Sequence, residues 1–96
     1  MSKDHPTGKS ALYEAILQLE TPEQAYRFLQ DVCSYSELSA MEQRYDIAEL
    51  LHRQQIYTSI MEKTGASSAI ISRVNRVLAA PDSMLKALLQ AREPQH

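Results

Sequence analysis

The chain has 96 residues, enough for one small domain, and its 44% hydrophobic and 23% charged residues are typical of a globular protein. Two glycines, four prolines and no tryptophan leave little material for the turns of a β-sheet protein, so an all-α fold is expected. A chain this short is too small for a multidomain enzyme or a large catalytic cleft.

Residues that could carry chemistry are few and scattered. The single cysteine, Cys33, excludes an intrachain disulfide, which suits a reducing cytoplasm, and its simplest interpretation is a small buried side chain. His5, His52 and His96 lack metal-ligand spacing, so we expect no metal and no enzyme. The sequence contains no run of about 18 apolar residues, so no membrane span is predicted. Residues 1–10 lack the apolar core of a secretory signal, and a cytoplasmic protein with a flexible N-terminal tail is expected.

Two short amphipathic helices are expected first. After Ser10, apolar residues recur at helical spacing, at Leu12, Ala15, Ile16 and Leu19. Thr21 can cap a second helix, Pro22 suits its first position, and Gln24 can reach back in a capping box. This helix ends near Cys33, and its apolar face contains Ala25, Phe28, Leu29 and Val32.

A third, longer helix follows a break at residues 34–36. Ser36 or Ser39 is expected to cap it, and Ser39 with Glu42 fits a second capping box. Its apolar face is broad and contains Leu38, Met41, Tyr45, Ile47, Ala48, Leu50 and Leu51. Either this is an ordinary core helix, or helices of a second chain pack on a face wider than one partner helix needs.

Three shorter helices are expected in the remainder, near residues 58–63, 68–79 and 83–92. Residues 11–92 then form one helical domain and residues 93–96 a C-terminal tail. No internal repeat and no strand-like alternation interrupts this pattern.

The net charge of −2 hides a segregation of charge along the chain. Residues 11–62 carry three basic against nine acidic residues, a net −6, whereas residues 63–81 carry Lys63, Arg73 and Arg76 without an acid, a net +3. A basic block in an acidic chain is where an anionic partner is expected to bind, although three charges also suit a solvated helix face.

The basic block coincides with a predicted helix-turn-helix at residues 57–76. Gly65 is the sole glycine there and can adopt the positive φ that the turn requires. With Gly65 as the turn, four apolar side chains point into the angle between the helices: Ile60, Ala66, Ile71 and Val74. Ser67 would cap the second helix, whose N-terminal end would enter a DNA major groove. The alternative is a helical hairpin within a bundle, ended by an ordinary glycine cap.

On this register, small polar residues and two arginines occupy the outer face of the second helix. Small side chains let a helix end approach base edges, hydroxyl and N–H groups bind phosphate, and arginine binds guanine or phosphate. The predicted DNA-contacting residues are Lys63, Ser67, Ser68, Ala69, Ser72, Arg73 and Arg76. Met61 fits less well: where the two helices cross, it has to bend aside or open the crossing.

Four segments carry a family resemblance: LYEAIL, AMEQRYDIAELL, TGASSAIISRVNR and the LAAP that ends at Pro81. They resemble the Trp-repressor-like family, most closely its YerC/YecD branch of short bacterial regulators, over about residues 12–89. The resemblance implies about six helices, interlocked as a homodimer, with the fourth and fifth helices reading DNA. It also implies a ligand pocket that contains Arg44 and Arg73, so Arg73 has two competing roles.

The resemblance departs from the Trp repressor at this pocket. The serine that helps hold tryptophan there has no clear match, because bulkier side chains follow Arg73. No cofactor is therefore expected, tryptophan is not favoured as a corepressor, and another small-molecule corepressor stays open. Arg44 also suits an ion pair with Glu37 or Glu49.

Two functional hypotheses follow. The first is a sequence-specific DNA-binding transcriptional regulator, a repressor, whose homodimer places two reading helices in successive major grooves of a near-palindromic operator. The second is a helical dimerisation module that no longer binds DNA and uses its acidic first half to bind basic proteins. Neither hypothesis involves a membrane or a metal.

Overall fold

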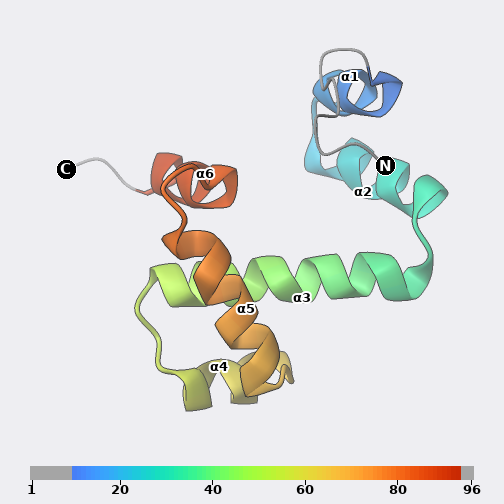
Figure 1. The fold of residues 1–96 in the computed structure, drawn as a ribbon. Helices are drawn as coiled ribbons and strands as arrows, with labels where there is room; N and C mark the ends of the chain where they lie inside the picture. The colour runs from blue at the N-terminus through green and yellow to red at the C-terminus, as the bar shows by residue number, and fades with distance from the viewer. Residues whose placement is uncertain (1–9, 94–96) are drawn as a thin grey trace. The chain divides into compact units, whose positions relative to one another are not determined.

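The computed structural model describes residues 10–93 and contains only α-helices over that range (Figure 1). Six helices follow one another: α1 (Ala11–Leu17), α2 (Pro22–Val32), α3 (Tyr35–His52), α4 (Tyr57–Thr64), α5 (Ser68–Ala79) and α6 (Met84–Ala91). The all-α class expected from the sequence is confirmed. Residues 1–9 and 94–96, most of both expected tails, lie outside the described residues.

The chain divides into two compact units, residues 1–38 and residues 39–96. In the first unit, α1 and α2 contain no buried residue. Phe28 and Leu29 are half-buried, whereas six other large apolar side chains are exposed: Leu12, Tyr13, Ile16, Leu17, Tyr26 and Val32. Cys33 is half-buried, where full burial was expected. Among the described residues 10–38, amphipathic helices are therefore present without a core of their own.

A capping arrangement begins α2, as the sequence predicts. Thr21 Oγ1 accepts the N–H of Gln24 at 3.0 Å, and Pro22 occupies the first turn. The Gln24 side chain reaches one residue further back than expected, because its Oε1 accepts the N–H of Glu20 at 2.8 Å. Both contacts satisfy backbone N–H groups around the start of the helix.

The start of α3 corrects the expectation from sequence. Ser34 and Glu37 form a reciprocal capping box, in which Glu37 N–H donates to Ser34 Oγ at 3.2 Å and Ser34 N–H donates to Glu37 Oε1 at 2.7 Å. The N–H of Ser34 and, to a smaller extent, its hydroxyl stabilise the carboxylate of Glu37. They hold the pKa of Glu37 below its usual range. The expected caps, Ser36 and Ser39, lie inside the helix, which begins at Tyr35, directly after the capping residue Ser34.

The second unit contains a small apolar core. Seven residues are buried in it: Ile47, Ala48, Ile60, Ala66, Ile71, Val74 and Leu89. Tyr45, Leu50 and Leu51 of α3 are only half-buried against this core, and Met41 is 41% exposed. The broad apolar face of α3 is therefore covered only in part by the chain's own unit.

Helix α3 ends in a turn that no glycine marks in the sequence. Gln55 N–H donates to Leu50 O at 3.0 Å, and Gln54 N–H donates to Leu51 O at 2.9 Å, the two bonds of a Schellman motif. Gln54 adopts φ 65°, a left-handed conformation that usually requires glycine. The three helices that follow lie within one residue of their expected bounds.

Candidate functional site

Helices α4 and α5 meet at a sharp turn centred on Gly65 (Figure 1). Gly65 adopts φ 72° and ψ 8°, and its N–H donates to Met61 O at 2.9 Å. No heavy atom lies within 4 Å of the position that a Cβ would take there. The left-handed backbone, rather than crowding, is therefore what requires glycine at this turn.

The angle between the two helices is filled as the sequence predicts. Ile60 and Ile71 are fully buried, and Ala66 and Val74 are each 4% exposed. Met61, by contrast, is 39% exposed, so its side chain is not buried at the crossing. The spacing of these apolar residues thus fixes which face of α5 points outward.

Two polar contacts missed from the sequence brace the turn. Thr64 Oγ1 donates to Ile60 O at 2.7 Å and accepts the N–H of Ala66 at 3.2 Å. Gln43 of α3 donates from Nε2 to Thr64 O at 3.0 Å. The Gln43 contact joins residues 21 positions apart, which no local sequence signal could reveal. It links the turn to the long helix.

The N-terminal end of α5 is capped and open to solvent. Ser67 Oγ accepts the N–H of Ile70 at 3.3 Å, the cap that the sequence predicts. The helix provides no acceptor for the N–H groups of Ser68 and Ala69, and both residues are exposed. This end of the helix therefore presents N–H groups and the positive end of the helix dipole to an anion.

The predicted DNA-contacting residues lie at the surface around this end. Six are exposed and one is half-buried: Lys63, Ser67, Ser68, Ala69, Arg73 and Arg76, with Ser72 the half-buried one. Within residues 10–93, neither arginine forms an ion pair. Lys63 Nζ donates to the neutral Gln55 Oε1 at 3.2 Å, so its charge is not cancelled either. Three uncompensated positive charges thus accompany the helix-turn-helix.

A separate apolar groove of about 390 Å³ lies in the second unit, between α3, α5 and α6. Its lining residues are Met41, Arg44, Tyr45, Val74, Val77 and Leu85. Arg44 contributes the one charged side chain, whereas Arg73 is not part of the lining. The structure therefore does not bring the two arginines of the expected pocket together in this groove. Nor does Arg44 use Glu49, which pairs with Arg53 at 3.6 Å.

Two other kinds of site find no support in the described part of the chain. Over residues 10–93, no group of three or more histidine, cysteine, aspartate or glutamate side chains is arranged to hold a metal ion. Across the same residues, no helix combines the length and hydropathy of a membrane span.

Comparisons with known proteins agree with this geometry. The profile of the family described as Trp repressor protein matches residues 8–93. The uncharacterized protein YerC of Bacillus subtilis (strain 168) is 42% identical over 80 residues, which cover 81% of this chain and 77% of that one.

Two crystal structures are similar over 83% of this chain. A TrpR-like protein from Eubacterium eligens ATCC 27750 has a TM-score of 0.78 at 40% identity over 82% of its own chain. A protein from Staphylococcus aureus, provisionally described as a Trp repressor, has a TM-score of 0.77 at 35% identity over 80% of its chain.

Proposed function

Because the chain belongs to the Trp repressor family, we propose that it is a sequence-specific DNA-binding transcriptional repressor that acts as a homodimer. The observation that carries the proposal is the outer face of α5. A capped, exposed helix end and two unpaired arginines lie on one side of a helix whose other side is buried. Small residues at the tip and uncompensated positive charge behind it suit the major groove of a duplex.

Each exposed residue has a role in this proposal. Ser68 and Ala69 lie at the tip of α5 and approach base edges, because short side chains allow close contact. Arg73 and Arg76 follow one and two turns later and bind phosphate or guanine. Lys63, at the end of α4, binds the phosphate backbone. We assign Arg73 to DNA because it does not line the groove to which Arg44 contributes.

A homodimer is supported by the imbalance between buried and exposed apolar residues. Among the described residues, fourteen large hydrophobic side chains are exposed and only seven residues are buried. Exposed apolar residues that gather into a large patch mark a surface that a partner covers. A second copy would cover it and present two α5 helices about 34 Å apart, one per turn of the duplex.

The apolar groove is proposed as the place for any small-molecule corepressor. Arg44 would pair with a carboxylate and the apolar wall would take the body of the ligand. The lining residues include no acid to pair with an ammonium group, so free tryptophan is not favoured. The protein itself needs no cofactor in this proposal.

Selection from a random duplex library tests DNA binding while the operator sequence is unknown. We expect enrichment of a near-palindromic site, whose affinity falls steeply between about 50 and 200 mM salt. Replacing Arg73 and Arg76 by alanine should weaken binding while circular dichroism and sedimentation stay unchanged. Arg53→Ala is the matched control, because it removes an arginine that lies outside the basic block. Equal affinity of the double variant and the wild type would remove α5 from the proposal.

A protein-interaction module is the second candidate. It is favoured by the acidic segment at residues 11–62, which carries a net charge of −6 from nine acidic and three basic residues. Such a surface suits basic protein partners. If the wild-type protein enriches no duplex even at low salt, this second function replaces the first.

A further inference from the structure

One side chain of the long helix α3 binds the turn of the helix-turn-helix. Gln43 is half-buried, and its Nε2 donates to Thr64 O at 3.0 Å. Thr64 is the last residue of α4, so its carbonyl is one of those that the end of a helix leaves without a partner in the helix. A carbonyl oxygen only accepts, so the amide nitrogen of Gln43 has to face it. A donor from outside the helix-turn-helix therefore satisfies a backbone group of its turn.

The hydroxyl of Thr64 connects this contact to both helices. Thr64 Oγ1 donates to Ile60 O, within α4, at 2.7 Å. The same oxygen accepts the N–H of Ala66 at 3.2 Å, and Ala66 directly precedes Ser67, the cap of α5. A displacement of Thr64 would therefore move the end of α4 and the start of α5 together.

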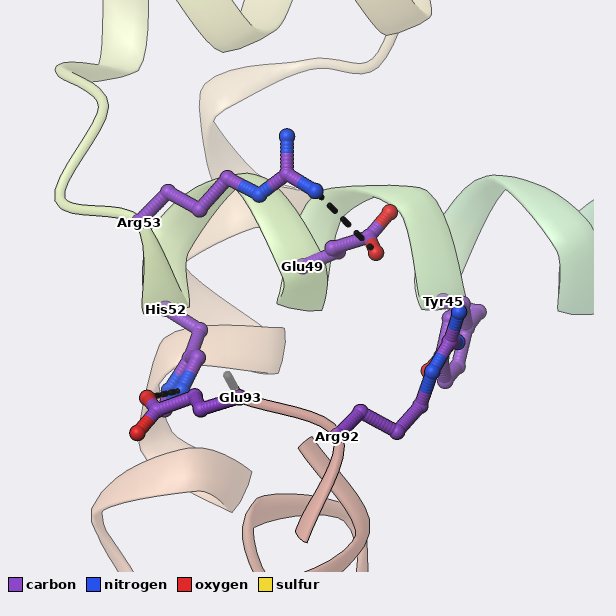
Figure 2. Close-up of polar contacts among 6 residues, drawn as sticks. All are labelled: Tyr45, Glu49, His52, Arg53, Arg92 and Glu93. Carbon is purple, nitrogen blue, oxygen red and sulfur yellow. Dashed lines mark hydrogen bonds and ion pairs between the residues drawn. The ribbon is translucent and has the colours of Figure 1, made fainter. Parts of the chain in front are cut away.

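The other long-range polar contacts of α3 lead to the opposite end of its unit's sequence, beyond the helix-turn-helix (Figure 2). Tyr45 Oη accepts from Arg92 Nη1 at 3.0 Å, and His52 pairs with Glu93. Both partners directly follow α6. Over the part of the chain that the structure describes, the contact of Gln43 is the one hydrogen bond that joins α3 to α4 or α5.

Apolar side chains supply the rest of the packing between α3 and the helix-turn-helix. Ile47 and Ala48 of α3 are buried in the same core as Ile60 and Ile71. Burial of apolar surface has no preferred direction, whereas a hydrogen bond weakens steeply as its angle departs from linearity. The core therefore resists separation of the helices, and the directional contact of Gln43 adds resistance to their rotation and sliding.

A small rotation of α5 is enough to matter for a duplex. The helix has twelve residues, so it is about 18 Å long. A rotation of about 10° around its C-terminal end would move its N-terminal tip by about 3 Å. That displacement is close to the rise of about 3.4 Å between successive bases of one DNA strand. The orientation of α5 against α3 therefore bears on which bases its tip can reach.

We propose that Gln43 is a positioning residue: its contact with Thr64 sets the orientation of the helix-turn-helix against α3, and so the separation of the two reading helices in the homodimer. This inference rests on the proposed DNA binding and adds a residue that determines operator spacing without touching DNA. Each protomer has its own copy of the contact, so its loss acts on both half-sites.

Residual dipolar couplings measure the orientation without DNA. In the wild type, amide couplings from α3, α4 and α5 should fit the structure with a single alignment tensor. Gln43→Met removes the donor at nearly constant length and unchanged charge, so the couplings of α4 and α5 should no longer fit the tensor of α3. Gln90→Met is the matched control, because Gln90 is exposed on α6, outside the helix-turn-helix. Equally good fits in all three proteins would overturn the positioning role.

Operator spacing tests the consequence for DNA, with the most enriched duplex of the random library as the probe. This duplex is compared with duplexes that have one base pair more or less between the half-sites, and with an unrelated duplex. Gln43→Met should lose about fivefold in affinity per half-site at the original spacing, the factor that one ordinary hydrogen bond supports. Its binding to the other duplexes should change little, so the preference for the original spacing shrinks.

Two further variants complete the comparison. Gln43→Lys keeps a donor that is long enough to reach Thr64 O, and it should restore part of the spacing preference. The charge that it adds acts on every duplex, so it cancels in the ratio of affinities. If circular dichroism shows that Gln43→Met is unfolded, Gln43→Asn takes its place in both experiments, because it keeps the amide but is one methylene too short for the contact.

The outcomes separate this inference from the proposed function. If Gln43→Met binds the enriched duplex with the spacing preference of the wild type, the positioning role is overturned while DNA binding stands. If it loses the same factor on every duplex, Gln43 only stabilises the fold, which also overturns the inference. If the wild type binds no duplex, the proposed function fails and this inference fails with it.

Discussion

The left-handed backbone of Gly65 leads to a prediction for the free energy of unfolding, and its magnitude follows from one dihedral angle. Gly65→Ala places a Cβ on a residue at φ 72°, where nothing lies within 4 Å, so the cost is conformational rather than steric. A left-handed conformation costs an L-residue about 1–2 kcal/mol. The smaller entropy of the unfolded alanine chain offsets about 0.4–1 kcal/mol of this cost. We expect the free energy of unfolding to fall by about 1 kcal/mol.

The structure offers an opposite change as a control. Gln54 adopts φ 65° at the end of α3, so Gln54→Gly should relieve the same kind of strain and raise the free energy of unfolding by about 1 kcal/mol. Gly65→Asn should cost less than Gly65→Ala, because asparagine tolerates this conformation better.

Urea unfolding followed by circular dichroism, at one fixed protein concentration, measures all three variants. Changes of about 1 kcal/mol shift the midpoint of thermal unfolding by about 4–8 °C in a domain of this size. If Gly65→Ala and Gln54→Gly shift stability in the same direction, the assignment of both effects to the left-handed backbone is wrong.

Three further predictions concern single side chains. Ile71→Ala should lower the free energy of unfolding by about 2–5 kcal/mol because Ile71 is fully buried. Ile70→Ala, at the 37% exposed neighbouring residue, should lower it far less. Comparable losses for the two variants in urea titrations would contradict the burial pattern. Ser67→Ala removes the cap of α5 and should cost about 0.5–2 kcal/mol, while Ser67→Asp should retain most of it, measured in the same way. The pKa of Glu37 is lower in the folded chain, so its stabilising effect is present at neutral pH and is lost as the pH falls below the ordinary pKa range of a glutamate. Wild type should therefore lose more stability than Glu37→Gln between about pH 6 and 3, and parallel curves would argue against the capping box.

The helix-turn-helix could be predicted from sequence because its determinants are local. Helical spacing identifies the inward side chains Ile60, Ile71 and Val74, and a single glycine marks the turn. Ser67 follows from its place before the next apolar stripe. Period, turn and cap all lie within about fifteen residues, and together they also decide which residues of α5 face outward.

Other features were missed for identifiable physical reasons. The true cap of α3 at Ser34 competes with the similar pattern at Ser39, and local sequence does not say which one the helix reaches. The left-handed Gln54 carries no glycine signal. The contacts of Gln43 with Thr64 and of Arg92 with Tyr45 join distant segments, so they depend on packing that no local pattern encodes. The position of Arg73 outside the apolar groove also depends on packing between distant segments.

The absence of buried residues in α1 and α2 has a consequence for how the chain behaves at low abundance. Helices with no core of their own gain stability only when another surface covers them, so their order depends on protein concentration. In a homodimeric repressor built this way, α1 and α2 would be partly unfolded at low protein concentration and fully folded at high protein concentration. The fraction of a two-fold operator that is occupied would then rise more steeply than in proportion to the protein concentration. A dimer that is already formed at every concentration would give a less steep rise.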